Sequence, residues 1–222
     1  MTKSAKLSTR SNIRQKGADA NRGWEQLRLR DRIRPDVRVL LVGINPGVRS
    51  AITGHHFAGF SNRFWKLLWE AKLVPEPITF EDDDRLPDWG IGITNLIARP
   101  TPGINDLRPA EYGEGWRVLE RKIVRFKPPV VALVGVTLYR AILPLLLARE
   151  KNEDNDGQPP RRSNIAPLTV GLQKARIGES RLFVLPNPSG RNANFTYAEM
   201  LDAFTQLARY LRSSKRAAAS GW

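Results

Sequence analysis

The chain has 222 residues, 41% of them hydrophobic and 26% charged, which is enough to fold around a core of its own. It contains no cysteine, which excludes disulfides, thiol catalysis, zinc fingers and cysteine-bound iron–sulfur clusters and favours a reducing intracellular compartment. Its 36 Lys and Arg exceed its 22 Asp and Glu, and the net charge of +14 favours a polyanionic partner, with nucleic acid ahead of a membrane surface.

The amino-terminal residues are basic, small and polar and show no apolar periodicity. We therefore expect residues 1–30 to form a disordered arm that can follow a phosphate backbone. The segment "WEQLRLRDRIRPD" predicts a short helix that stops at Pro35. One folded domain is expected over residues 31–212, followed by a flexible tail over residues 213–222.

A first strand is predicted where apolar, β-favouring residues follow one another from Val39 to Val42, with Val37 just upstream. Pro46 and Gly47 stop this strand abruptly, which leaves Asn45 at its carboxyl end. In an open α/β sheet that edge is where ligands bind. An Asn-Pro pair is also a common turn initiator, so Asn45 alone does not establish a site.

The next segments predict a helix, an acidic loop and a second strand. "NRFWKLLWEAKLV" has core aromatics at helical spacing, with Ser61 or Asn62 as the cap. Residues 75–89 are expected to form a loop whose acidic run, residues 81–84, is a solvated surface. "GIGITNLI" predicts a strand that carries Asn95, and "ARPTPG" ends it.

A long helix is expected from Arg108 to about Phe126, with an apolar stripe formed by Tyr112, Trp116, Val118, Leu119, Ile123 and Val124. "PPVVALVG" then predicts a strand that is buried on both faces. "VTLYRAILPLLLAR" predicts a helix bent at Pro144. The charged segment that follows, residues 150–164, is expected to be a loop.

"RLFVLPNPSG" predicts another strand that ends in Pro and Gly, and "TYAEMLDAFTQLARYLR" predicts a final amphipathic helix. Thr196 is its expected cap, with Glu199 as the capping-box partner. Strands thus alternate with helices, which indicates an α/β fold with three layers, a mainly parallel central β-sheet flanked by helices.

Amide and hydroxyl side chains follow three of these strands: Asn45, Asn95 with Thr101, and Asn187 with Ser189. The carboxyl ends of parallel strands meet at one edge of the sheet, so we expect these groups to line one crevice. Because an amide both donates and accepts hydrogen bonds, such a crevice can read the edge of a nucleobase.

Several other chemistries lack support. No phosphate-binding loop of the G-x-x-x-x-G-K-[ST] or G-x-G-x-x-G type is present, and "NPSG" is not the G-x-S-x-G elbow of a hydrolase. No stretch approaches the roughly 18 apolar residues of a membrane helix. His55 and His56, the only histidines, are adjacent and have no companion ligands, so we expect no metal and no cofactor.

Four motifs occur together from about Val37 to Arg212: "GINPG", "GHHFAG" followed by "NRFWK", "GIGITNLIARPTPGINDL" and "LPNPSG". In order and spacing they resemble the mismatch-specific uracil and thymine DNA glycosylases of the uracil-DNA glycosylase superfamily. The resemblance implies a uracil-DNA glycosylase-like fold and double-stranded DNA with a mispaired or damaged base as the partner. It also implies a monomer in the bacterial cytoplasm, associated with the nucleoid, or in a eukaryotic nucleus.

The resemblance also assigns roles to particular residues. Asn45 would hold the water that attacks the sugar, and the base pocket would comprise Ile44, Ser50, His56, Phe57, Asn95 and Thr101. The loop of Asn187, Pro188, Ser189, Gly190 and Arg191 would contact DNA, with Arg191 as the wedge that enters the base stack. His56 and Phe57 could instead be packed structural residues. Ala98 replaces an acidic residue that relatives often carry.

The expected reaction is hydrolysis of the N-glycosidic bond of a flipped uracil in mismatched duplex DNA, as the first step of base excision repair. Thymine, ethenocytosine and 5-substituted uracils are further candidate substrates. Two alternatives stay open: a branch of the superfamily that prefers uracil alone or hypoxanthine and xanthine, and a DNA-binding module that has kept the fold without catalysis.

Overall fold

The computed structural model describes residues 23–153 and 170–219. Five strands form one sheet in the order β2-β1-β3-β5-β4. The strands β1, β2, β3 and β5 are parallel, and β4 pairs with β5 in the antiparallel sense. Their bounds are β1 Val39–Gly43, β2 Ile91–Asn95, β3 Val130–Val134, β4 Gly171–Ile177 and β5 Ser180–Leu185.

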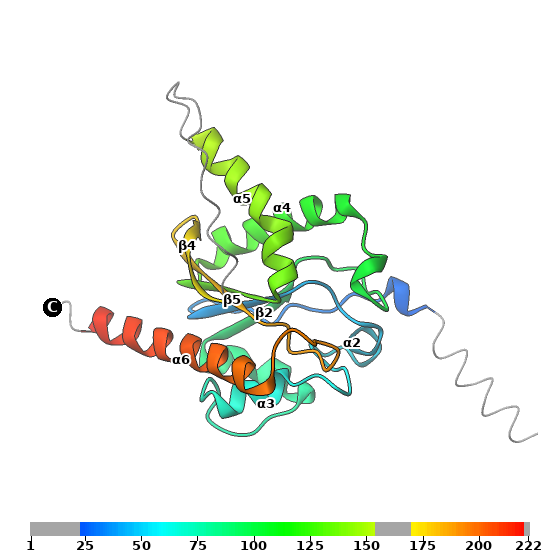
Figure 1. Cartoon of the computed structure of the whole chain (residues 1–222), viewed down its shortest axis with the longest axis horizontal. Coiled ribbons are helices and arrows are strands. Elements are labelled where there is room, and N and C mark those ends of the chain that lie inside the picture. Colours follow the sequence, from blue (N-terminus) through cyan, green and yellow to red (C-terminus); the bar gives the residue numbers. More distant parts are fainter. Residues whose placement is uncertain (1–22, 154–169, 220–222) are drawn as a thin grey trace, which may run out of the picture.

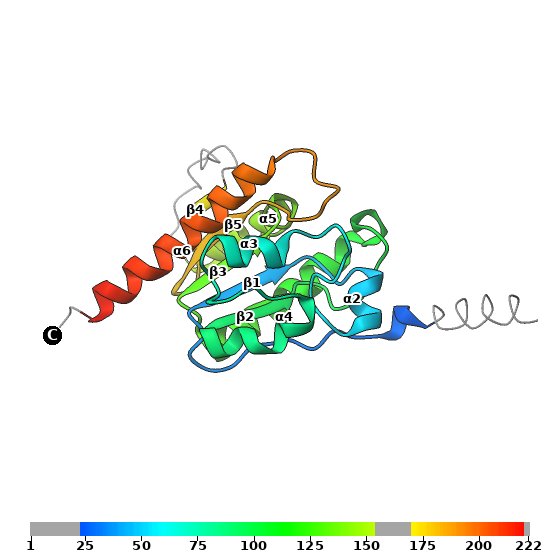
Figure 2. The ribbon, with the colours of Figure 1, turned by 90° about the horizontal axis from the view of Figure 1, so that it is seen from below.

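Helices cover both faces of the sheet, with α3 and α6 on one side and α4 and α5 on the other (Figures 1 and 2). The α-helices are α2 Val48–Thr53, α3 Phe64–Glu70, α4 Pro109–Phe126, α5 Val136–Glu153 and α6 Tyr197–Ala219. The described residues also form three 3-10 helices, which are η1 Trp24–Gln26, ahead of β1, η2 Phe80–Trp89 and η3 Ile104–Asp106. The predicted three-layer α/β fold is confirmed.

The core is divided by the sheet because successive side chains of a strand point to opposite faces. Leu41 of β1 packs with α3 and α6, whereas its neighbours Leu40 and Val42 pack with α4 and α5. All five residues of β1 and of β3 are buried, as expected for central parallel strands. This rigid centre holds the carboxyl ends of β1, β2 and β5 at one edge.

Two predicted elements are wrong. The helix expected in residues 24–36 is only the three-residue η1, and the chain then runs extended so that Arg32 bridges Ile93 of β2. The segment 75–89 is not a simple loop, because residues 80–89 form η2. The acidic run on η2 is not wholly solvated either, since Asp83 is fully buried.

Other boundaries differ in smaller ways. α6 continues to Ala219, so most of the tail expected from residue 213 is helical. Val118 and Val124 of α4 are exposed, because the buried stripe of this helix is narrower than the sequence suggested. β4 and the short helix α2 were not predicted.

The predicted capping box at the start of α6 is confirmed. The backbone N–H of Thr196 donates to the Glu199 carboxylate, and the backbone N–H of Glu199 donates to the Thr196 hydroxyl. Residues 1–22 of the expected arm, and most of the expected loop 150–164, lie outside the described residues.

Candidate active site

Asn45 lies two residues beyond the last residue of β1, and its amide nitrogen is fully occupied. Nδ2 is 2.7 Å from Thr101 Oγ1, 3.1 Å from the carbonyl oxygen of Arg99 and 3.1 Å from that of Pro46. The other end of the amide, Oδ1, has no hydrogen-bond partner among the described residues. The side chain is partly exposed. The amide is therefore held in one orientation, with its carbonyl oxygen left over to accept a hydrogen bond.

The segment that holds Asn45 is itself anchored. Thr101 is buried, and its hydroxyl donates to the carbonyl of Gly103 at 2.7 Å, so its lone pair remains for Asn45. Arg99 makes two 2.7 Å contacts to the carboxylate of Glu111 on α4. These bonds from Arg99, with those from Arg108, lower the pKa of Glu111 to about 2. The carboxylate thus stays charged and keeps the loop fixed at neutral pH.

Gly43, the last residue of β1, lies where Asn95 and Phe57 come together. A Cβ atom added to Gly43 would be 2.4 Å from Asn95 Oδ1 and 3.2 Å from Phe57 Cζ, closer than packed atoms allow. Glycine therefore lets the Asn95 amide and the Phe57 ring approach the strand. Ile44, the next residue, is half-buried and packs on the opposite side of the sheet, against the core formed with α4 and α5, so the structure does not bring its side chain to Phe57.

Phe57 is half-buried and has a left-handed backbone, with φ of 49°. Such a conformation is uncommon for a bulky residue and must be imposed by its surroundings. One face of the ring stacks on Phe64 of α3, with centroids 4.1 Å apart and planes inclined by 17°. Phe57 is therefore packed on one face while its edge reaches Gly43, so the two interpretations made from the sequence are not exclusive.

Two residues, Ser50 and Asp83, hold the loop that carries Phe57. Ser50 of α2 is buried, and its hydroxyl accepts a 3.0 Å hydrogen bond from the backbone N–H of Ala58. On the other side, the buried carboxylate of Asp83 accepts the backbone N–H of His56 at 2.8 Å, Arg32 Nε at 2.9 Å and His55 Nδ1 at 3.1 Å. Asp83 is thus an organising residue for the loop.

His56 is 1% exposed and packed rather than presented to a ligand. Burial lowers the pKa of its imidazole, so the ring is neutral at neutral pH. Its Nε2 lies 3.0 Å from the carbonyl of Arg30, which can only accept, so the proton is on Nε2 and Nδ1 is the acceptor. Asn95 Nδ2 lies 3.5 Å from that Nδ1, an arrangement that turns Asn95 Oδ1 away from the histidine.

The loop after β5 lies against the loop that follows Phe57. The backbone N–H of Arg63 donates to the carbonyl of Pro188 at 3.0 Å, and a Cβ on Gly190 would come within 2.5 Å of Ser61. Asn187 Oδ1 accepts the backbone N–H of Ser189, which shapes a tight turn. Arg191 stands exposed beyond that turn.

Residues 31–212 match the Uracil DNA glycosylase superfamily. The chain belongs to the uracil-DNA glycosylase superfamily. It is also 34% identical over 160 residues to the G/U mismatch-specific uracil DNA glycosylase of Schizosaccharomyces pombe, an alignment that covers 71% of this chain and 45% of that protein. The chain thus spans about half the length of this relative.

In the structure, the predicted site residues fall into two groups. Asn45 and Thr101 are in direct contact, as are His56 and Asn95, and Phe57 joins the second pair at Gly43. Ser50 acts on the loop, and the residues 187–191 form a neighbouring rim. Four contributing residues were missed: Gly43, Asp83, Arg99 and Glu111. A glycine ending an apolar strand was a usable signal for Gly43, whereas nothing in the sequence marked the others.

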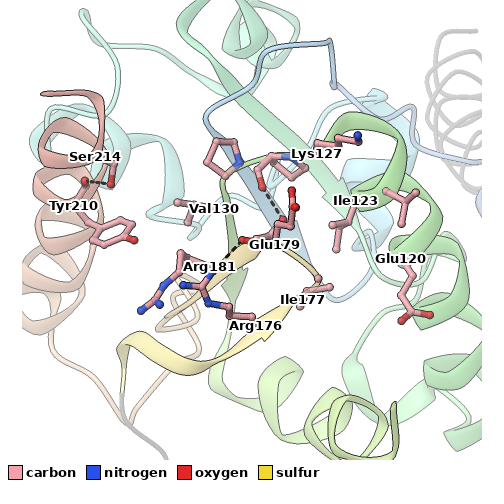
Figure 3. A pocket seen from close by; sticks show the side chains of 15 residues that line it. Glu120, Ile123, Lys127, Val130, Arg176, Ile177, Glu179, Arg181, Tyr210 and Ser214 are labelled. Carbon is pink, nitrogen blue, oxygen red and sulfur yellow. Dashed lines mark hydrogen bonds between the residues drawn. The ribbon is translucent and has the colours of Figure 1, made fainter. Parts of the chain in front are cut away.

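A cavity of about 740 Å³ lies at the opposite edge of the sheet from Asn45 and is not the candidate active site (Figure 3). It is lined by Val130 and Arg181, at the amino ends of β3 and β5, and by Tyr210 of α6. None of the predicted site residues lines it. Among residues 23–153 and 170–219, no cluster of ligands could hold a metal ion, and no helix is long and apolar enough to cross a membrane.

Proposed function

We propose that the chain is a monofunctional DNA glycosylase that removes uracil from mismatched duplex DNA by hydrolysing its N-glycosidic bond. The observation that carries this proposal is the Asn45 amide, whose nitrogen has three acceptors while its carbonyl oxygen has no partner among the described residues. The superfamily match and the name of the yeast relative support it. DNA as substrate would place the enzyme in the bacterial cytoplasm or a eukaryotic nucleus.

Asn45 acts by positioning rather than by proton abstraction, since a carboxamide is neutral and a poor base. Its Oδ1 accepts a hydrogen bond from a water molecule and aims the water at C1′ of the flipped nucleotide. Holding a reactant in an attack geometry is a large share of catalysis when the sugar already has oxocarbenium character. The base leaves as an anion, which backbone N–H groups stabilise in the manner of an oxyanion hole.

Asn95 reads the edge of the pyrimidine. Its Nδ2 is turned toward His56, which leaves Oδ1 as an acceptor beside Gly43 and Phe57. Uracil offers an N3–H donor to such an acceptor, whereas cytosine presents an unprotonated N3 and would meet Oδ1 as a second acceptor. The neutral His56 ring therefore favours uracil over cytosine by fixing the orientation of one amide.

Excision from a panel of paired oligonucleotides tests the function. We expect cleavage of U·G to be fastest, because unstacking costs least at a mispair and Asn95 matches uracil. Duplexes with T·G, ethenocytosine·G and hypoxanthine rank the other superfamily branches. Preference for hypoxanthine would overturn the assignment of uracil, and binding of every duplex without any excision would favour the non-catalytic module.

Arg191 is the wedge that fills the space left by the flipped nucleotide. Its exposed side chain follows a turn that is held by Asn187 and packed on Ser61. The backbone that carries the guanidinium is therefore fixed. A planar guanidinium stacks well on bases. Replacing Arg191 with alanine is expected to slow excision from U·G duplexes about tenfold or more and to leave excision from single-stranded DNA within about twofold. Equal losses on both substrates would reduce Arg191 to a phosphate contact.

A further inference from the structure

One phenylalanine side chain stands almost wholly in solvent beside the candidate active site. Phe60 is 91% exposed, whereas Val124, the next most exposed large hydrophobic residue in the described part of the chain, is 66% exposed. Single apolar side chains on a surface are common, but a phenyl ring in this position leaves most of a large apolar area in water. Burial of that area against a partner is favourable, and the place of the ring in the fold indicates which partner it meets.

Hydrogen bonds fix the backbone that carries this ring. The backbone N–H of Asn62 donates to the carbonyl of Gly59 at 3.0 Å, so Phe60 and Ser61 are the two central residues of a β-turn. Asn62 Oδ1 in turn accepts the backbone N–H of Phe64, the first residue of α3, at 3.0 Å. The ring therefore extends into solvent from the tip of a turn whose backbone is already ordered.

The ring is also supported from one side. The guanidinium of Arg49, on α2, lies 3.5 Å from the centroid of Phe60. Such a cation–π contact limits the positions that an exposed ring can occupy. Because a guanidinium keeps its charge at every relevant pH, the same contact places a positive charge next to the exposed ring.

The turn lies between the base pocket and the proposed wedge. Phe57, three residues before Phe60, reaches the base pocket with its ring edge. Ser61, the residue after Phe60, is in close contact with the loop that carries the wedge, since a Cβ added to Gly190 would be 2.5 Å from Ser61 Cβ. An exposed aromatic ring is thus placed at the edge where a flipped nucleotide would leave the duplex.

Charge favours DNA as the partner of this surface. Residues 57–63 and 187–191 include two arginines and no acidic residue, and the whole chain has a net charge of +14. Arg49 adds a further positive charge beside Phe60. Proteins that open a base step insert apolar side chains, phenylalanine among them, from surfaces that also bind phosphates. Aromatic faces stack on any base, since every base has a π-face.

We propose that Phe60 is a second DNA-inserting residue, which stacks on a base beside the flipped nucleotide while Arg191 fills the vacated position. The inference rests on the proposed function, because its ligand is a duplex with a flipped uracil. In an intact duplex the bases cover one another, so the ring finds an open base face only where flipping has opened the stack. Phe60 therefore stabilises the flipped complex and contributes little to the binding of intact DNA.

Duplex affinity tests this role without turnover. The ligand is a U·G duplex that carries 2′-fluoro-2′-deoxyuridine, because the electron-withdrawing fluorine slows hydrolysis. We expect Phe60→Ala to weaken binding of this duplex about tenfold, the loss of one base–aromatic stack, and to weaken binding of the matched C·G duplex less than about twofold. Fluorescence anisotropy measures both affinities.

Two further substitutions separate stacking from apolar bulk. Phe60→Trp keeps an aromatic face and should bind the U·G duplex within about twofold of wild type. Phe60→Leu keeps apolar volume without a flat face and should lose most of the affinity that Phe60→Ala loses. Because phenylalanine carries no charge, Phe60→Ala should also keep the wild-type slope of log affinity against log salt concentration.

Val124→Ala is the matched control. Val124 is also an exposed apolar residue, but it lies on α4 beside the cavity at the amino ends of the strands, away from the base pocket. Its replacement should leave the affinity for both duplexes within about twofold. Because Val124 and Phe60 are exposed, both variants should unfold at the wild-type temperature, which thermal denaturation checks.

The proposal is overturned if Phe60→Ala binds the U·G duplex as tightly as wild type, if it weakens binding of U·G and C·G duplexes equally, or if Phe60→Leu has full affinity. These experiments measure binding and do not depend on excision. A wild-type protein that removes no uracil would refute the proposed function. Normal excision by wild type together with unchanged affinity of Phe60→Ala would refute only the role of Phe60.

Discussion

Asn45→Ala is expected to reduce single-turnover excision from U·G duplexes by at least about 100-fold while leaving duplex affinity within about twofold. The change removes the oxygen that aims the water and leaves the loops that contact DNA in place. The oxygens of Pro46, Arg99 and Thr101 lose the Asn45 amide as a donor. Because Asn45 is partly exposed, water can take the place of that donor. Rapid-quench kinetics and fluorescence anisotropy with the same duplex measure the two quantities.

Thr101 provides the matched control for that result. Thr101→Val keeps the shape but removes the oxygen that accepts Asn45 Nδ2 at 2.7 Å, so we expect a smaller loss, of about tenfold, from a looser amide. Thr101→Ser restores the hydroxyl and should recover most of the rate. If Asn45→Ala and wild type cleave equally fast, or if Thr101→Ser is as slow as Thr101→Val, the amide does not position the nucleophile.

The main outline of this site could be predicted because strand direction is readable in the sequence. Continuous apolar runs mark buried parallel strands, and Pro and Gly mark where they stop, so Asn45 and Asn95 had to lie at one edge of the sheet. The direct contact of Asn45 with Thr101 follows from the pairing of β1 with β2, which continues as a bridge between Gly47 and Thr101. The resemblance to the superfamily supplied the roles of the site residues, and the order of the strands explains why Asn45 and Thr101 lie close together.

The remaining parts of the site depend on contacts between distant segments, which local pattern does not encode. β4 alternates buried and exposed residues only loosely and is short of apolar residues, so it was missed as an edge strand. The left-handed Phe57 follows from the packing of its ring on Phe64 and from the hydrogen bonds of its neighbours, and not from local propensity. Arg99 and Glu111 are 12 residues apart and meet only because the loop between them returns the first turn of α4 to Arg99.

Asp83 shows this limit most clearly. In the sequence it is one of four consecutive acids, a pattern typical of a solvated surface, and its neighbours Glu81 and Asp84 are indeed exposed. The turn geometry of η2 directs only Asp83 inward, where it meets Arg32 and the histidine pair of "GHHFAG". A buried carboxylate requires such partners, because an unpaired charge in the interior is costly.

Asp83→Ala is therefore expected to lower the free energy of unfolding by about 3 kcal/mol, near the lower end for breaking a buried ion pair because Arg32 can be partly rehydrated. Urea denaturation measures the loss. Asp84→Ala, at the next position of the same acidic run, is the matched control and should change stability by less than about 0.5 kcal/mol. Equal effects from the two substitutions would mean that the acidic run acts only through its overall charge.

The same substitution also tests how the base pocket is held. Asp83 accepts the backbone N–H of His56, the residue before Phe57 and the one whose ring lies against Asn95. Without that acceptor the left-handed conformation of Phe57 loses a constraint, so excision should fall even at temperatures where Asp83→Ala is fully folded. Asp83→Asn keeps one carbonyl oxygen for the His56 N–H and should retain more activity than Asp83→Ala, although it also loses the charge that pairs with Arg32. A folded Asp83→Ala protein with the full rate would show that Phe64 and Ser50 are sufficient to fix the loop.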